Sequence, residues 1–170
     1  MVVMATSPIV SYSVSKDGVA EWSELHADAW IGLLETHKQL TRELDAELEA
    51  RFDLTLSTVE LLGRLGAAPD RCLRLTALAS ACGLSLSRVS RLAAGLERRG
   101  LLERRPVDDD GRAVEAHLTS AGLELLRQAQ EVHFASVKRA FFDRLSESEL
   151  QTLATVFARL AEQPPETCST

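Results

Sequence analysis

Apolar side chains recur at alternating three- and four-residue steps along the first third of the chain. These steps are typical of one face of a helix and predict a helix from Glu21 to Arg51. The stripe consists of His26, Trp30, Leu33, His37, Leu40, Leu44 and Leu48. A second apolar row, Trp22, Leu25 and Ala29, lies beside its first turns. The helix is therefore apolar on more than one side there, which is more than packing against a single neighbour requires.

Three further helices are expected from their caps. Ser57, with Glu60 three residues later, predicts a short helix that ends near Gly66. Thr119 predicts a long helix that continues to about Arg144. A capping box at 146–149 starts the last helix. The apolar rows of the last two helices are Leu123, Leu126, Ala129, His133, Val137 and Phe141, and Leu150, Leu153, Phe157 and Leu160.

The middle of the chain predicts two short helices joined by a tight turn. Thr76 is placed to cap the first, and Gly83 to end it, because glycine adopts the left-handed conformation at no steric cost. Ser85 is a good N-cap for the second helix, which runs to Arg99. So brief a connection makes the helices cross steeply, as in a helix-turn-helix. The buried face of the second helix is expected to be Val89, Leu92, Ala93 and Leu96.

A β-hairpin is expected directly after this motif. Leu101 to Arg105 and Ala113 to Leu118 can pair as two strands, and the residues at 106–112 are typical of a turn. A hairpin in this place is a wing. The expected fold is therefore mainly α, a winged helix-turn-helix with about six helices and a two-stranded wing.

Composition narrows the class of protein. The chain has 170 residues, 45% of them hydrophobic and 26% charged, as in an ordinary globular protein. Its three cysteines, Cys72, Cys82 and Cys168, form neither a disulfide framework nor a CxxC metal motif. No secretory signal and no membrane helix are recognised, so we expect a cytoplasmic protein without a membrane partner. No nucleophile elbow, P-loop, HExxH or dinucleotide motif occurs, so we expect no enzyme, no cofactor and no metal.

Charge is distributed unevenly along the chain. The net charge is −6, yet residues 71–118 contain nine Arg and six acidic residues, which leaves −9 for the rest. All the cations of this segment are arginines, whose forked donors suit phosphates and guanine edges. Each arginine taken singly could belong to an ordinary solvated face. Together with the predicted helix-turn-helix and wing, they predict a DNA-binding surface.

Several motifs in this segment occur in a recognisable order. They are residues 78–85 (LASACGLS), residues 96–106 (LERRGLLERRP), residues 108–112 (DDDGR) and residues 118–122 (LTSAG). In this order the segment 75–122 resembles the MarR family of bacterial winged helix-turn-helix transcriptional regulators. The order of the surrounding helices fits the family over about residues 21–162.

The resemblance implies a homodimer on double-stranded DNA in the bacterial nucleoid. Residues 21–52 and 119–162 would be the dimerisation helices, and residues 53–118 the DNA-binding domain. Residues 1–20 would be an N-terminal extension without predicted order, and 163–170 a tail. Two reading heads would enter successive major grooves of a palindromic operator, about 34–36 Å apart. The dimer interface is expected to include Trp22, Leu25, Phe141, Leu153 and Phe157.

The expected DNA contacts lie on the second helix of the motif and on the wing. The hydroxyl and guanidinium groups of the helix can reach phosphates and base edges. By resemblance, Arg112 enters the minor groove and Asp110 orients it. Asp108 and Asp109 are expected to face away from DNA, because three successive acidic residues would otherwise oppose phosphate. The expected contacts on the helix are Ser85, Ser87, Arg88, Ser90 and Arg91. From the wing, Arg104 and Arg105 are expected to contact the DNA backbone.

The regulatory signal is left open by the sequence. Many relatives are repressors released by a small molecule, often an aromatic acid, whereas others sense cysteine oxidation or zinc. His26, Trp30 and His37 share one stripe and could bind an aromatic anion, or they are core residues. The eleven-residue spacing of the two histidines is poor for zinc.

Two alternatives to a ligand-released repressor remain. The first is a redox-sensing regulator that uses Cys72, which is expected in a loop beside Arg71 and Arg74, since nearby cations lower a thiol pKa. Cys82 is expected to be a small buried residue instead. The second alternative is a winged-helix module that binds protein without DNA, and the arginine cluster disfavours it.

Overall fold

The computed structural model describes residues 12–107 and 110–161, and the side chains of residues 110–112 lie outside the description. The chain divides into two compact units, residues 1–43 and 44–170. None of the helices in the described ranges combines the length and the apolar character that a membrane crossing needs.

A β-hairpin precedes the first helix. Strands β1 (Tyr12–Val14) and β2 (Ala20–Trp22) are antiparallel, and the rings of Tyr12 and Trp22 meet edge to face at 6.4 Å. Helix α1 spans Glu24–Phe52. The expectation that Trp22 begins the apolar row of this helix is wrong, because its cross-strand partner places it on β2. Residues 12–20 of the expected N-terminal extension belong to this hairpin, and residues 1–11 lie outside the description.

Helix α2 (Leu56–Ala67) supplies the centre of the core in the second unit. Its Leu61, Leu62 and Leu65 are fully buried. The helix begins with a capping box of Thr55 and Thr58, in which the Thr55 N–H donates to the Thr58 hydroxyl at 2.6 Å. The expected cap at Ser57 is therefore wrong. The N3 position of the observed box is Thr58 and not the Glu or Gln of the sequence rule, and Glu60 instead pairs with Arg64 at 3.2 Å.

The helix-turn-helix lies as predicted. It consists of α3 (Leu75–Ala81) and α4 (Leu86–Arg98). Gly83 and Gly100 have φ of +63° and +70°, which explains why both helices end at glycine. Ser85 caps α4, since its hydroxyl accepts the Arg88 N–H at 3.3 Å. Thr76 does not cap α3, because the preceding strand leads directly into a helix that already begins at Leu75.

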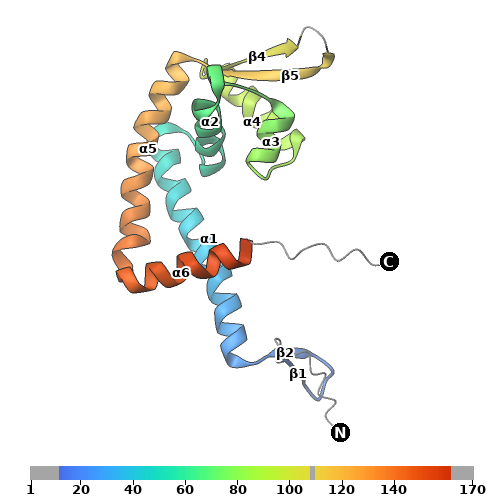
Figure 1. The fold of residues 1–170 in the computed structure, drawn as a ribbon, viewed down its shortest axis with the longest axis vertical. Helices are drawn as coiled ribbons and strands as arrows, with labels where there is room; N and C mark the ends of the chain where they lie inside the picture. The colour runs from blue at the N-terminus through green and yellow to red at the C-terminus, as the bar shows by residue number, and fades with distance from the viewer. Residues whose placement is uncertain (1–11, 108–109, 162–170) are drawn as a thin grey trace. The chain divides into compact units, whose positions relative to one another are not determined.

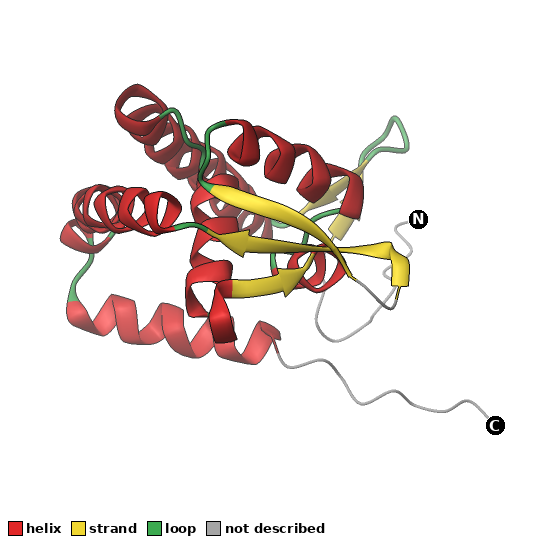
Figure 2. Cartoon of the chain, turned by 90° about the horizontal axis from the view of Figure 1, so that it is seen from above, coloured by secondary structure: helices red, strands yellow, loops and turns green. Residues whose placement is uncertain are grey.

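The wing belongs to a three-stranded antiparallel sheet in the order β3-β5-β4 (Figure 2). The strands are β3 (Cys72–Arg74), β4 (Leu102–Val107) and β5 (Asp110–Leu118), and a 3-10 turn (Pro69–Arg71) precedes β3. One face packs on the helices through side chains such as Ala116 and Leu102, which are buried. The prediction of a two-stranded wing thus omitted β3, and Cys72 lies on a strand, not in a loop.

The C-terminal part is helical. Helix α5 (Ser120–Ala140) is capped by Thr119, as predicted, and a 3-10 turn (Phe142–Arg144) follows it. Helix α6 (Glu147–Ala161) starts at the predicted capping box, where the Ser146 N–H donates to Glu149 at 2.8 Å. In Figure 1, α5 runs beside the end of α1, and the Arg139 guanidinium donates to Glu47 at 2.8 Å. No residue of α6 is buried within the described protomer.

Candidate nucleic-acid interface

Helix α4 packs on the protein core with one face and exposes the other to solvent. Val89, Ala93 and Leu96 are buried, as the spacing predicts, and Leu92 is half-buried. Ser87, Arg88 and Arg91 are exposed, and Ser90 is half-buried. The first two turns of α4 therefore present hydroxyl and guanidinium groups from a helix that its own core fixes.

The two arginines at the start of α4 differ in their surroundings. One Nη of Arg88 donates to the Ser57 hydroxyl of α2 at 3.2 Å, so this guanidinium has a defined position. Arg91 makes no hydrogen bond or ion pair within the described residues. Its charge is therefore available to an anion without the loss of an intramolecular partner.

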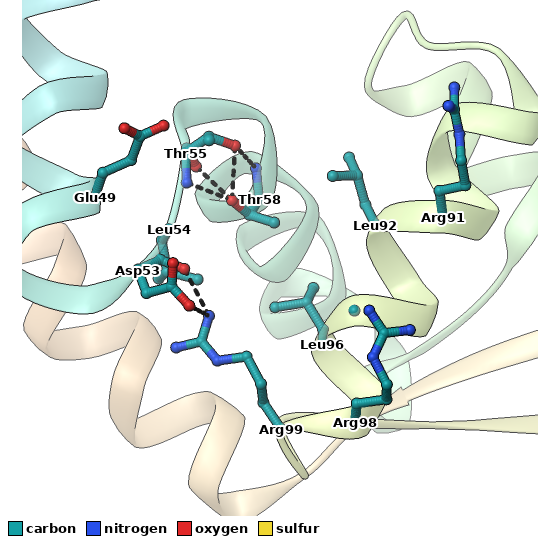
Figure 3. Close-up of a pocket in the computed structure, with 11 residues that line it drawn as sticks. Glu49, Asp53, Leu54, Thr55, Thr58, Arg91, Leu92, Leu96, Arg98 and Arg99 are labelled. Carbon is teal, nitrogen blue, oxygen red and sulfur yellow. Dashed lines mark hydrogen bonds and ion pairs between the residues drawn. The ribbon is translucent and has the colours of Figure 1, made fainter.

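A cavity of about 440 Å³ lies between α4 and the junction of α1 and α2 (Figure 3). Arg91 and Arg98 line it from α4, and Glu49 and Asp53 line it from the opposite side. Arg99 closes one edge, since its two Nη atoms donate to the backbone carbonyls of Asp53 at 2.6 Å and Phe52 at 2.8 Å. Carbonyls at a helix end have no intrahelical partner. Arg99 thus fastens the end of α1 to the end of α4, a role the sequence did not reveal.

Replacing Arg99 with alanine should lower the free energy of unfolding by about 1–2 kcal/mol, because two charge-assisted hydrogen bonds to backbone carbonyls are lost. Arg98→Ala is the matched control, since Arg98 is exposed and has no hydrogen-bond partner among the described residues. Urea denaturation at equal protein concentration measures both variants. Equal unfolding midpoints for the two would contradict the role given to Arg99.

The wing arginines Arg104 and Arg105 are ion-paired. Arg104 is half-buried, and its Nε and backbone N–H donate to the two carboxylate oxygens of Glu97 at 2.8 and 2.9 Å. These hydrogen bonds hold the pKa of Glu97 below its usual value. Arg105 pairs with Glu103 at 2.6 Å. Arg104 therefore joins the wing to α4, and a DNA contact would have to share its guanidinium with Glu97.

The wing tip lies partly outside the description. Asp110 and Arg112 belong to β5 by their backbone, but their side chains are not described, nor are Asp108 and Asp109. Their expected roles stay predictions.

The candidate effector residues are on α1. His26 is half-buried and its Nδ1 lies 2.6 Å from the Ser23 hydroxyl. Trp30 is 55% exposed, and His37 is exposed as well. In the protomer these side chains are therefore not core residues.

The expected dimer residues present apolar surface. Leu25 is 77% exposed, Trp22 52% and Phe157 46%, whereas Phe141 and Leu153 are half-buried.

The expectation that nearby arginines lower the pKa of the Cys72 thiol is wrong. Its pKa is raised, first by burial and then by the hydrogen bond to Glu115. Arg74, which was expected to lower it, instead directs its Nε toward Glu115 at 3.8 Å. Burial also raises the pKa of Cys82, which is half-buried.

Known proteins resemble this chain over most of its length. A model of the MarR family matches residues 52–113. The crystal structure of Sco3205 in complex with DNA, a MarR family transcriptional regulator from Streptomyces coelicolor, is 31% identical. It covers 88% of this chain and 96% of its own, with a TM-score of 0.78. AbsC, a MarR family transcriptional regulator from the same organism, is 32% identical over 83% of this chain and 95% of its own, with a TM-score of 0.76.

A curated relative from Bacillus subtilis agrees with these structures. The HTH-type transcriptional regulator YhjH of strain 168 is 27% identical over 136 residues, which are 78% of this chain and 77% of YhjH. All three relatives are transcriptional regulators by name. The ordered motifs, the capped α4 with its wing and the identity across nearly the whole length lead to one conclusion: the chain belongs to the MarR family of transcriptional regulators.

Proposed function

We propose that this protein is a sequence-specific regulator that binds double-stranded DNA as a homodimer on a palindromic operator. The observation that carries the proposal is the open face of α4, where Ser87, Arg88 and Arg91 are exposed while the opposite face is buried. A helix of this kind fits the major groove, where arginine can bind guanine edges and phosphates. The solved structure of Sco3205, which is similar along its length, is a complex with DNA.

Each candidate contact has its own role in this proposal. The guanidinium of Arg91, which has no partner among the described residues, binds a base edge or a phosphate, and Arg88, positioned by Ser57, binds the DNA backbone. Ser85, Ser87 and Ser90 contribute hydroxyl groups at the positive end of the helix. Arg112 reaches the minor groove from the wing tip with Asp110 orienting it. Because Arg104 and Arg105 already form ion pairs with Glu97 and Glu103, we assign them weaker contacts with the DNA backbone.

A second copy of the chain is part of the proposal. Helix α6 has no buried residue in the protomer, although Phe157 and Leu160 are apolar and 46% and 70% exposed. Large apolar side chains exposed one turn apart on a helix are typical of a protein–protein contact. A two-fold dimer that covers these residues would place two α4 helices on one operator, with half-sites about one helical turn apart.

We further propose that the protein represses transcription and is released by a small, aromatic and anionic ligand. The exposed Trp30 offers a stacking surface, and His26 and His37 on the same helix can donate hydrogen bonds to a carboxylate. Compounds that dissociate the protein from operator DNA would identify the ligand. Trp30→Ala should then abolish the response and leave DNA affinity unchanged.

The test of DNA binding is a single arginine replacement. Arg91→Ala should weaken operator binding by about 1–3 kcal/mol, because one guanidinium contact is lost. Arg127→Ala is the matched control, since it removes an exposed arginine of α5 that pairs with Glu124 at 3.5 Å. Fluorescence anisotropy with an operator selected from genomic fragments measures both, at several salt concentrations.

Two results would contradict the proposal. One is equal affinity of Arg91→Ala and Arg127→Ala for the selected operator. The other is a failure of the intact protein to select any DNA fragment, which would favour the alternative of a winged-helix module that binds protein. Binding by counterion release predicts instead a steep fall of affinity with salt.

A further inference from the structure

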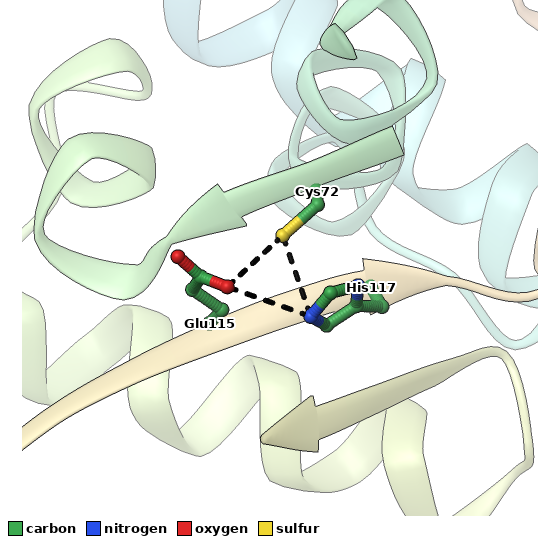
Figure 4. Close-up of side chains that lie close together, drawn as sticks. All are labelled: Cys72, Glu115 and His117. Atoms are coloured by element: carbon green, nitrogen blue, oxygen red, sulfur yellow. Dashed lines mark hydrogen bonds and ion pairs between the residues drawn. The ribbon is translucent and has the colours of Figure 1, made fainter. Parts of the chain in front are cut away.

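Three potential metal ligands converge on the face of the wing sheet opposite the buried Ala116 and Leu102. Cys72 lies on β3 and is the direct cross-strand partner of His117 on β5. Glu115 lies two residues before His117, so its side chain points to the same face of the sheet. Figure 4 shows the thiol, the imidazole and the carboxylate directed toward one another. Within residues 12–107 and 110–161, these three side chains form the one cluster of potential metal ligands.

The three donor atoms have the spacing of a metal's coordination shell. The Cys72 Sγ lies 3.4 Å from His117 Nε2 and 3.5 Å from Glu115 Oε2, and Nε2 and Oε2 are 3.7 Å apart. Around a tetrahedral zinc ion with bonds of about 2.0–2.3 Å, neighbouring donor atoms are separated by about 3.3–3.8 Å. The triangle in the protein therefore matches one face of such a tetrahedron without rearrangement of the strands.

The surroundings also suit a metal ligand set. Glu115 uses Oε2 toward the other two donors, while its Oε1 faces the Nε of Arg74 at 3.8 Å. An outer partner of this kind orients a ligating carboxylate. The side chains of Glu115 and His117 are 31% and 27% exposed, so the site is shielded on the sheet side and open toward solvent. The open side leaves the fourth position to a water molecule.

We propose that Cys72, Glu115 and His117 form a zinc site that ties β3 to β5. Thiolate, imidazole and carboxylate together favour zinc over magnesium or calcium, which prefer oxygen ligands alone. On binding, the ion replaces the proton of the Cys72 thiol, and that proton passes to the solvent. Since β3 leads directly into α3, the occupied site fixes the wing sheet to the helix-turn-helix.

The first measurement uses Co²⁺ as a spectroscopic substitute for zinc. The full-length chain with Cys82→Ser and Cys168→Ser keeps Cys72 as its single thiol. With one equivalent of Co²⁺, it should develop a thiolate-to-cobalt charge-transfer band and the visible bands of a tetrahedral ion. Adding Cys72→Ser to this background should abolish the charge-transfer band. A missing band in the parent, or a band that persists without Cys72, would overturn the proposal.

The second measurement addresses affinity and stability with zinc itself. Titration calorimetry should give one zinc ion per chain, and Glu115→Gln and His117→Gln should each lower the association constant about tenfold or more. Zinc should raise the unfolding temperature of the parent but not of these variants. Circular dichroism without metal checks that each variant is folded. Binding of several weak equivalents that these substitutions do not change would mean surface adsorption and would overturn the site.

Discussion

Gly122→Ala is expected to lower the free energy of unfolding by about 3 kcal/mol, because the added methyl group would overlap backbone atoms. A Cβ at this position would lie 1.9 Å from the Leu101 carbonyl oxygen and 2.8 Å from a methyl of Leu118. Gly122 is buried in the first turn of α5, and its N–H donates to the Thr119 hydroxyl at 3.0 Å. Relief of the overlap would require α5 to move away from the turn that joins α4 to the wing.

Gly63→Ala is the matched control for this prediction. Gly63 lies inside α2, and a Cβ there would meet no atom within 4 Å. Alanine should therefore raise the free energy of unfolding by about 0.5–1 kcal/mol, since glycine is the poorer helix former. Urea denaturation at equal protein concentration compares the two variants. Similar midpoints for both would show that the close approach at Gly122 relaxes freely.

The elements that could be predicted from the sequence are those with strong local signals. The ends of α4 follow from the Ser85 hydroxyl and from the positive φ of Gly100, both of which act within a few residues. The buried face of α4 follows from helical spacing alone. In contrast, the start of α2 was predicted at Ser57 with Glu60, whereas the structure uses a box of Thr55 and Thr58.

Features that depend on contacts between residues far apart in the sequence could not be predicted from it. Strand β3 has three residues, and it exists because it pairs with the edge of β5, where Cys72 lies opposite His117, 45 positions further along the chain. The convergence of Cys72 with His117 follows from that register and could not be read from spacing. Likewise, the sequence shows the net positive charge of residues 71–118, but it does not show which of these arginines have partners within the protein. Arg99 and Arg104 hold the fold together, whereas Arg91 has no partner among the described residues.

Phe157→Arg is expected to raise the dissociation constant of the proposed dimer about a hundredfold or more. The reason is that an unpaired guanidinium would be buried in an apolar contact, at a cost of about 3 kcal/mol or more. Phe157 is 46% exposed in the protomer and belongs to a helix without buried residues, so the substitution should leave the fold of the single chain intact. Sedimentation velocity over a dilution series measures the constant, and circular dichroism checks the fold.

Gln151→Arg introduces the same charge on the same helix but on its polar side. Gln151 is exposed, and its position is about 120° from that of Phe157 around a helix with 3.6 residues per turn. This variant should remain a dimer and bind the operator like the parent. Because one reading head binds half an operator, Phe157→Arg should also lose most operator affinity although every arginine of α4 is present. If Phe157→Arg stays dimeric at the parent's dissociation constant, α6 does not form the dimer contact, and the geometry proposed for two α4 helices on one duplex fails with it.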